Sequence, residues 1–130
     1  MNMSPNNNSY LIEDFENAVN RLEEVLSLEK TAIIRDSAIK RFELCFDLAW
    51  KSIKLYAKDQ GVECYSPREC FKTAFQLKLI DYNEAWLKMI DTRNLVAHLY
   101  KEEMAEKLFL RLSDYLVLFK KLLSDLKQES

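Results

Sequence analysis

The sequence predicts an all-α fold, an up-and-down helical bundle that resembles a four-helix bundle and has about five helices. The chain has 130 residues, 48% of them hydrophobic and 31% charged, a balance typical of one soluble helical domain. It contains one glycine and two prolines, too few for the turns of a β-rich fold. Apolar residues recur at intervals of three and four, which is the period of an α-helix.

The first two helices are expected over residues 9–28 and residues 34–60. Ser9 is a suitable N-cap for the first, and residues 1–8 before it are expected to form a disordered tail. The second is the longest, and Gly61, the only glycine, follows it where a left-handed C-terminal cap belongs. Residues 9–130 are therefore expected to fold as one domain.

The third helix has the clearest start in the sequence. Ser66 supplies a capping hydroxyl, Pro67 suits the first helical position, and Glu69 stands three residues after the cap. This helix is expected to reach about Lys78, and residues 81–84 repeat the capping pattern before a fourth helix. The last helix is expected to be continuous over residues 102–127.

Composition restricts the function. A net charge of −2 argues against general coating of nucleic acid, so any contact with RNA must be local. No apolar stretch approaches the roughly 20 residues of a membrane span, and the N-terminus does not read as an export signal. We therefore expect a cytoplasmic protein without membrane contact. Cys45, Cys64 and Cys70 are expected to be buried or incidental thiols there, since their spacing does not fit a metal site.

The segment from residue 91 to residue 100 holds the only histidine and groups several polar side chains. Asn94 precedes His98 by four residues, so the two share a helix face and the amide can orient the imidazole. Arg93 lies about 140° away from His98 around an undistorted helix. The two can converge through the reach of arginine, a helix end near His98, or a second copy of the chain across a two-fold axis.

These residue types suit cleavage of a phosphodiester. A neutral histidine can take a proton from a ribose 2′-hydroxyl, and an arginine can hold the phosphate and stabilise its developing charge. The single histidine lacks the Glu-x-x-His or His-x-x-x-His spacing of a zinc or di-iron site. We therefore expect neither a metal nor another cofactor.

The pattern Arg-Asn-x-x-x-His-x-Tyr at residues 93–100 resembles the signature of the HEPN superfamily, the higher eukaryotes and prokaryotes nucleotide-binding domains. The chain is similar in particular to the bacterial and archaeal nucleotidyltransferase substrate-binding proteins. The similarity covers nearly the whole chain after the tail. It includes residues 40–51, residues 66–69, the Ala85 and Trp86 pair, and residues 91–98.

The resemblance implies a helical homodimer whose two motifs lie near each other, and a cognate minimal nucleotidyltransferase as partner. It implies a toxin, a metal-independent RNase in which His98 acts in attack by the 2′-hydroxyl and Arg93 stabilises the phosphate. The nucleotidyltransferase would be the antitoxin and would transfer AMP to Tyr100. One alternative is a non-catalytic subunit that binds a nucleotide or substrate for the nucleotidyltransferase. Another is a helical interaction protein that keeps the motif for dimer packing.

Two carboxylates are candidates for a supporting role. Glu43 lies near the apolar face of the second helix and can support Arg93 or the imidazole. The alternative is that Glu43 and Asp47 belong to a solvated flank, in which Asp47 pairs with Lys51 one turn away. Asp91 either positions Arg93 through a salt bridge or only decorates the helix surface.

Overall fold

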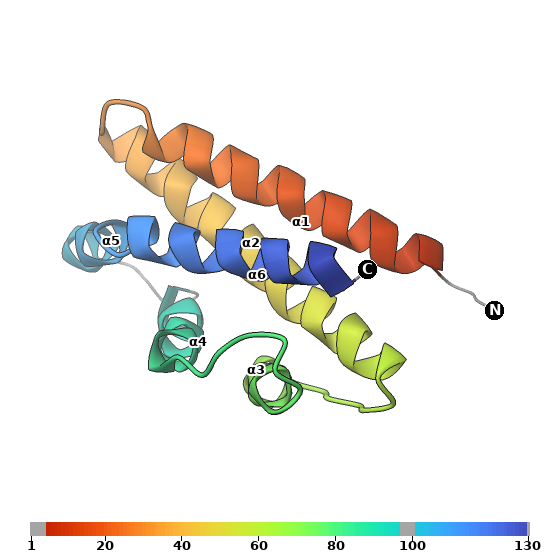
Figure 1. Ribbon diagram of the computed structural model, residues 1–130. Helices are drawn as coiled ribbons and strands as arrows, with labels where there is room; N and C mark the ends of the chain where they lie inside the picture. Colours follow the sequence, from red (N-terminus) through yellow and green to blue (C-terminus); the bar gives the residue numbers. More distant parts are fainter. Residues whose placement is uncertain (1–4, 97–100, 130) are drawn as a thin grey trace.

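The protein is described by a computed structural model that covers residues 5–96 and 101–129, with side chains from Tyr10 onward. These residues form helices and no strand, which confirms the all-α class (Figure 1). The helices are α1 (Pro5–Leu26), α2 (Ala32–Asp59), α3 (Pro67–Gln76), α4 (Glu84–Val96), α5 (Glu102–Phe109) and α6 (Leu112–Glu129). None of the described helices is both long and apolar enough to cross a membrane.

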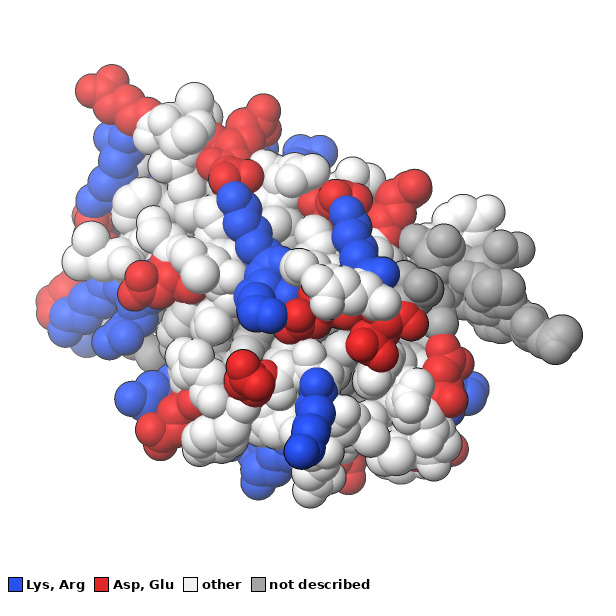
Figure 2. Space-filling model, viewed as in Figure 1, with Lys and Arg blue, Asp and Glu red and all other residues white. Residues whose placement is uncertain are grey.

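The long helix α2 is the centre of the bundle. It packs against α1, α3, α5 and α6, while α6 also packs against α1 (Figure 1). Two ion pairs on the surface join α6 to α1, one from Lys120 to Glu23 and one from Lys127 to Glu16. On the face shown in Figure 2, basic and acidic side chains alternate and no large patch has a single sign.

A chain of aromatic side chains runs through the core. Phe42 of α2 packs against Tyr115 and Phe119 of α6, with ring centroids 5.5 Å and 6.2 Å away. At the other side of the core, Phe71 of α3 stacks on Trp86 of α4 at 4.7 Å. Trp86 in turn meets Phe119 edge to face at 6.0 Å. These contacts fix α3 and α4 onto the α2–α6 pair, because buried aromatic pairs add to the energy of area burial.

Local capping signals agree with the structure at two helix ends. Gly61 has φ of +82°, and the N–H groups of Gly61 and Val62 donate to the carbonyls of Lys58 and Ala57 after α2. This is the double hydrogen bond of a left-handed C-terminal cap, as predicted. At α3, the Ser66 hydroxyl accepts a hydrogen bond from the Glu69 N–H at 3.2 Å.

Other helix boundaries differ from the prediction. Helix α1 begins at Pro5 instead of Ser9, a start that fits the tolerance of proline in the first turn of a helix. Residues 1–4 of the expected tail lie outside the described residues. Helix α2 begins at Ala32, where Thr31 caps the N–H of Ile34 at 3.1 Å.

The prediction of one continuous helix over residues 102–127 is wrong. Helix α5 ends at Phe109 and α6 begins at Leu112. Between them, the Arg111 N–H donates to the Leu108 carbonyl at 2.9 Å, three residues back instead of the four of an α-helix. Leu108 and Leu112 are both buried, while Leu110 between them is 76% exposed. The break lets α5 pack on the start of α2 while α6 covers the core, and neither glycine nor proline marks it.

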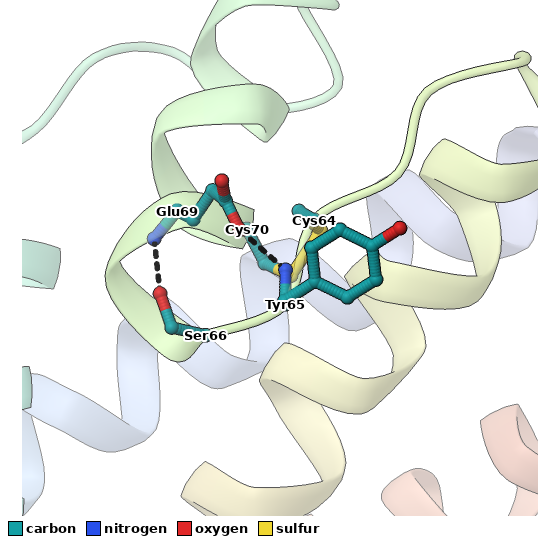
Figure 3. The surroundings of a disulfide bond; sticks show 5 residues. All are labelled: Cys64, Tyr65, Ser66, Glu69 and Cys70. Carbon is teal, nitrogen blue, oxygen red and sulfur yellow. Dashed lines mark hydrogen bonds between the residues drawn. A yellow bond between two sulfur atoms is a disulfide. The ribbon is translucent and has the colours of Figure 1, made fainter.

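The expectation of three thiols is also wrong, because Cys64 and Cys70 form a disulfide (Figure 3). Cys64 stands in the connection before α3 and Cys70 in the second turn of that helix, and the capping turn at Ser66 brings them together. Their Cα atoms are 5.1 Å apart, within the usual range for a disulfide. Cys45 is a buried free thiol whose pKa is raised to about 12 by burial.

A buried arginine attaches α5 to the first turn of α2. The Arg35 side chain is 7% exposed, and its guanidinium contacts Glu106 at 2.9 Å, Asp36 at 3.0 Å and Glu102 at 3.4 Å. Lys30 also pairs with Glu106. These hydrogen bonds, from Lys30 and then from Arg35, lower the pKa of Glu106 below its ordinary value of 4.5. A carboxylate with a lowered pKa stabilises the fold above its unfolded-state pKa, and that contribution is lost as the pH falls through the folded-state pKa.

We therefore expect Glu106→Gln to lower the melting temperature at neutral pH. The melting temperature of the variant should also fall less than that of the wild type as the pH is lowered from about 6 to about 3. Thermal unfolding followed by circular dichroism across that range measures both effects. Glu103→Gln is the control, because Glu103 is 79% exposed and contacts Lys107 at 3.7 Å. Equal acid sensitivity of the two variants would contradict a role for Glu106 in holding α5.

Candidate functional site

Arg93 lies in the last turn of α4 and reaches a groove on the outside of α1 and α2. The groove has a volume of about 740 Å³. Its lining residues come from three helices: Asp14, Asn17, Ala18 and Arg21 of α1, Lys40, Arg41, Glu43, Leu44, Asp47 and Leu48 of α2, and Arg93 of α4. The groove is therefore built by chain segments that are far apart in the sequence.

The Arg93 guanidinium is only loosely held. Its nearest carboxylate is Asp47, with 3.7 Å between the nitrogen and the oxygen, and the two side chains are 26% and 40% exposed. The Arg93 Nε atom is buried and has no hydrogen-bond partner among the described residues. Buried donors are nearly always paired in folded proteins, so this one is unusual among the described residues. The exposed part of the same side chain, 26% of it, lies at the groove, where an anionic ligand can contact it, since guanidinium groups bind phosphate oxygens well.

The two carboxylates predicted to support the site have different roles. Asp91 pairs with Arg68 of α3 at 3.0 Å, so its salt bridge joins α3 to α4 instead of positioning Arg93. Glu43 does line the groove with Arg93, as one of the two interpretations proposed, but Asp47 makes the contact to the guanidinium. In the sequence, Asp47 was distinguishable only as a member of the flank of α2.

The structure does not test the expected contacts of Asn94, His98 and Tyr100 in the site. Asn94 is exposed near the end of α4. Its expected partner His98 and the expected modification site Tyr100 lie outside the described residues. The arrangement of the imidazole, the amide and the phenol therefore stays a prediction.

The charges in the groove are mixed. Arg41 donates to the Arg21 carbonyl at 2.7 Å and contacts Glu24 at 3.4 Å, so it serves the packing of α1 on α2. Arg21, Lys40 and Arg93 line the groove beside the carboxylates Asp14, Glu43 and Asp47. Within the described part of the chain, no group of three acidic, cysteine or histidine side chains is arranged to hold a metal ion.

A second, smaller hollow lies on the other side of the end of α4. It has a volume of about 210 Å³ and is lined by Thr92, Leu95 and Val96 together with residues of α5 and Arg111. The Thr92 hydroxyl lies 3.1 Å from the Tyr115 hydroxyl of α6, a hydrogen bond that orients this turn of α4. The last turns of α4 thus stand between two openings, with Arg93 facing the larger one.

A family model described as nucleotidyltransferase substrate binding protein like matches residues 10–128. The chain belongs to this family. The match covers most of the chain and confirms the resemblance found in the sequence motifs. The family residues include both the groove and the segment that carries Arg93 and His98.

Known relatives agree with this assignment. A Haemophilus influenzae protein named probable ribonuclease HepT is 25% identical over 108 residues, covering 76% of this chain and 74% of the relative. A crystal structure of a Thermus thermophilus protein is 36% identical, with a TM-score of 0.80 over 86% of this chain and 98% of that one.

A second solved structure supports the fold alone. It is a Haemophilus influenzae protein described as revealing the fold of a substrate binding domain of a nucleotidyltransferase. It is 20% identical, with a TM-score of 0.68 over 94% of this chain and 98% of that one. The helical bundle of this family is therefore kept across large differences in sequence.

The weak hold on Arg93 leads to a prediction. Asp47→Asn should lower the free energy of unfolding by less than about 1 kcal/mol, because a long contact between partly exposed charges contributes little. Urea denaturation measures the change, and Glu43→Gln in the same groove is the matched control. A loss of more than about 3 kcal/mol would show that the pair behaves as a buried salt bridge, and that Arg93 is tied to the fold.

Proposed function

We propose that this protein is a metal-independent endoribonuclease of the HEPN type. The observation that carries the proposal is the Arg93 guanidinium at the wall of an open groove, partly exposed and held among the described residues only by a long contact to Asp47 at 3.7 Å. A phosphate is the ligand that best suits a guanidinium in this position. The name of the Haemophilus relative, probable ribonuclease HepT, supports the same activity.

In the proposed reaction, the imidazole of His98 removes the proton from a ribose 2′-hydroxyl. The 2′-oxygen attacks the adjacent phosphorus, the bond from phosphorus to the 5′-oxygen breaks, and the 5′-oxygen takes a proton from water. The hydroxide left behind takes the proton from the His98 imidazolium, which restores the neutral imidazole. The products are a 2′,3′-cyclic phosphate and a 5′-hydroxyl. Arg93 stabilises the extra negative charge on the phosphate as the new bond forms. Asn94 orients the imidazole, and Glu43 and Asp47 limit the motion of the guanidinium.

The groove also suggests how an RNA strand is held. Arg21 and Lys40 line the groove together with Arg93, which supports a role for them in binding phosphates that flank the cleaved bond. Among the described residues that line the groove, none is aromatic, so they do not hold bases by stacking. We therefore propose that the strand is bound mainly through its phosphates and with little preference for base sequence.

We further propose that the chain is a cytoplasmic toxin that acts as a homodimer and is neutralised by a cognate minimal nucleotidyltransferase. The family description, which names a nucleotidyltransferase, supports this partner. Transfer of AMP from ATP to the Tyr100 hydroxyl would release pyrophosphate and place a phosphodiester two residues from His98. Its negative charge and bulk would exclude an RNA phosphate from the site.

A second candidate function is supported by the family description and by the Haemophilus substrate-binding fold. Here the chain is a non-catalytic subunit, and the groove holds a nucleotide for the nucleotidyltransferase. The same guanidinium would then bind a nucleotide phosphate without any role for His98 in bond cleavage.

The nuclease proposal predicts that the purified protein cleaves single-stranded RNA in the presence of EDTA and leaves 2′,3′-cyclic phosphate ends. His98→Ala and Arg93→Ala should each reduce the rate by about a hundredfold or more while the melting curve keeps its shape. Arg111→Ala is the control, because Arg111 is an exposed arginine outside the groove.

Gel analysis of a labelled oligonucleotide and mass spectrometry of its ends measure the outcome. Full activity of the His98→Ala variant would refute the proposed base. Absence of cleavage, together with nucleotide binding that depends on Arg93 but not on His98, would favour the binding subunit instead.

The partner proposal predicts a mass gain of one AMP on the Tyr100 peptide after incubation with the cognate nucleotidyltransferase and ATP. Tyr100→Phe should abolish the gain and leave the RNase insensitive to the partner. Tyr82→Phe is the control, because Tyr82 is another tyrosine and is 67% exposed. Modification that persists in the Tyr100→Phe variant would place the target elsewhere.

A further inference from the structure

The disulfide closes the turn that begins α3. Cys64 and Cys70 are six residues apart and fully buried, and the capping residues lie between them (Figure 3). The Ser66 hydroxyl accepts from the Glu69 N–H, and the Glu69 carboxylate accepts from the Tyr65 N–H. The same short segment is thus held twice, by these two hydrogen bonds at the start of the helix and by a covalent bond.

This turn is connected to the helix that carries Arg93. Phe71, the residue after Cys70, stacks on Trp86 of α4 at 4.7 Å. From the first turn of α3, Arg68 pairs with Asp91 at 3.0 Å, two residues before Arg93. Interactions that hold the start of α3 in place therefore also hold the surface against which α4 packs.

We propose that Cys64 and Cys70 are a reversible redox pair, and that its oxidation state sets how firmly α3 holds α4 and the Arg93 side chain. The effect on RNA cleavage rests on the proposed function, whereas the effect on α4 does not. The co-reactant is a dithiol. One of its thiolates attacks a protein sulfur and forms a mixed disulfide, and its second thiolate then releases the protein. The protein disulfide gains two electrons and two protons, and the dithiol becomes a disulfide.

The surroundings of the pair make exchange feasible without unfolding of the core. The sulfur atoms are buried, but Tyr65 is 68% exposed and Ser66, Arg68 and Glu69 are exposed as well. Opening of this single capping turn brings the disulfide to solvent, and helix ends open more readily than the core. Cys45 is different: it lies in the middle of α2 with a pKa raised to about 12, so its reactive thiolate is suppressed.

The test uses the full chain in buffers with different ratios of oxidised to reduced dithiothreitol. Alkylation under native conditions, followed by mass spectrometry, should show that two thiols appear and disappear together while Cys45 stays unmodified. In the reduced protein, amide hydrogen exchange should become roughly tenfold faster at the start of α3 and in α4, and stay unchanged in the middle of α1 and α6. The melting temperature should fall by roughly 5–10 °C.

The variant Cys64→Ala with Cys70→Ala should behave as the reduced protein at every ratio, and Cys45→Ala should keep the full response. The proposal is overturned if the pair stays in one state throughout the series while the protein is folded. It is also overturned if the pair changes state and exchange in α4 does not. RNA cleavage on the same samples should be slower after reduction, and absence of cleavage in both states counts against the nuclease proposal alone.

Discussion

The contact of Trp86 with Phe71 and Phe119 is the constraint on which the site depends. Trp86 is 3% exposed, stacks on α3 with one face and meets α6 at an edge. It stands near the start of α4, and Arg93 follows it two turns later on the same helix. Because a helix is a rigid element, the packing of Trp86 at its start determines the position of the Arg93 guanidinium near its end. The Arg68–Asp91 pair and the Thr92–Tyr115 hydrogen bond then fix the rotation of α4.

Two arginines show the difference between a residue that serves the fold and one suited to a ligand. Arg35 is 7% exposed and contacts three carboxylates, so its charge is compensated within the chain. These ion pairs stabilise the packing of α5 on α2. Arg93 has one carboxylate at 3.7 Å and a buried Nε–H with no acceptor in the described residues. A buried polar atom without a partner is costly, so an arginine that is held this loosely is better suited to a ligand than to the packing of the fold.

Much of the fold could be predicted from local patterns. The capping serine before α3 and the glycine after α2 act on the residues next to them, so their signals are visible in the sequence. The split between α5 and α6 could not be predicted, because it arises from packing of α5 on the start of α2 and has no glycine or proline to mark it. The disulfide was missed because the three cysteines, odd in number, were expected to stay reduced thiols in a cytoplasmic protein. That Cys64 and Cys70 come close follows from the turn at Ser66, which no composition argument contains. The site shows the same division. Arg93 and Glu43 belong to recognisable patterns, but Asp47 and Arg21 share the groove with Arg93 only because α1, α2 and the end of α4 meet there.

Binding of an RNA phosphate by the Arg93 guanidinium is the central claim. Nitrogen-15 NMR of the arginine side chains tests it most directly, in a titration with an oligoribonucleotide whose 2′-oxygens are all methylated and which therefore cannot be cleaved. We predict that the side-chain signals of Arg93 shift as the oligonucleotide binds, while those of Arg35 do not change. An unchanged Arg93 signal at saturating oligonucleotide would contradict the account.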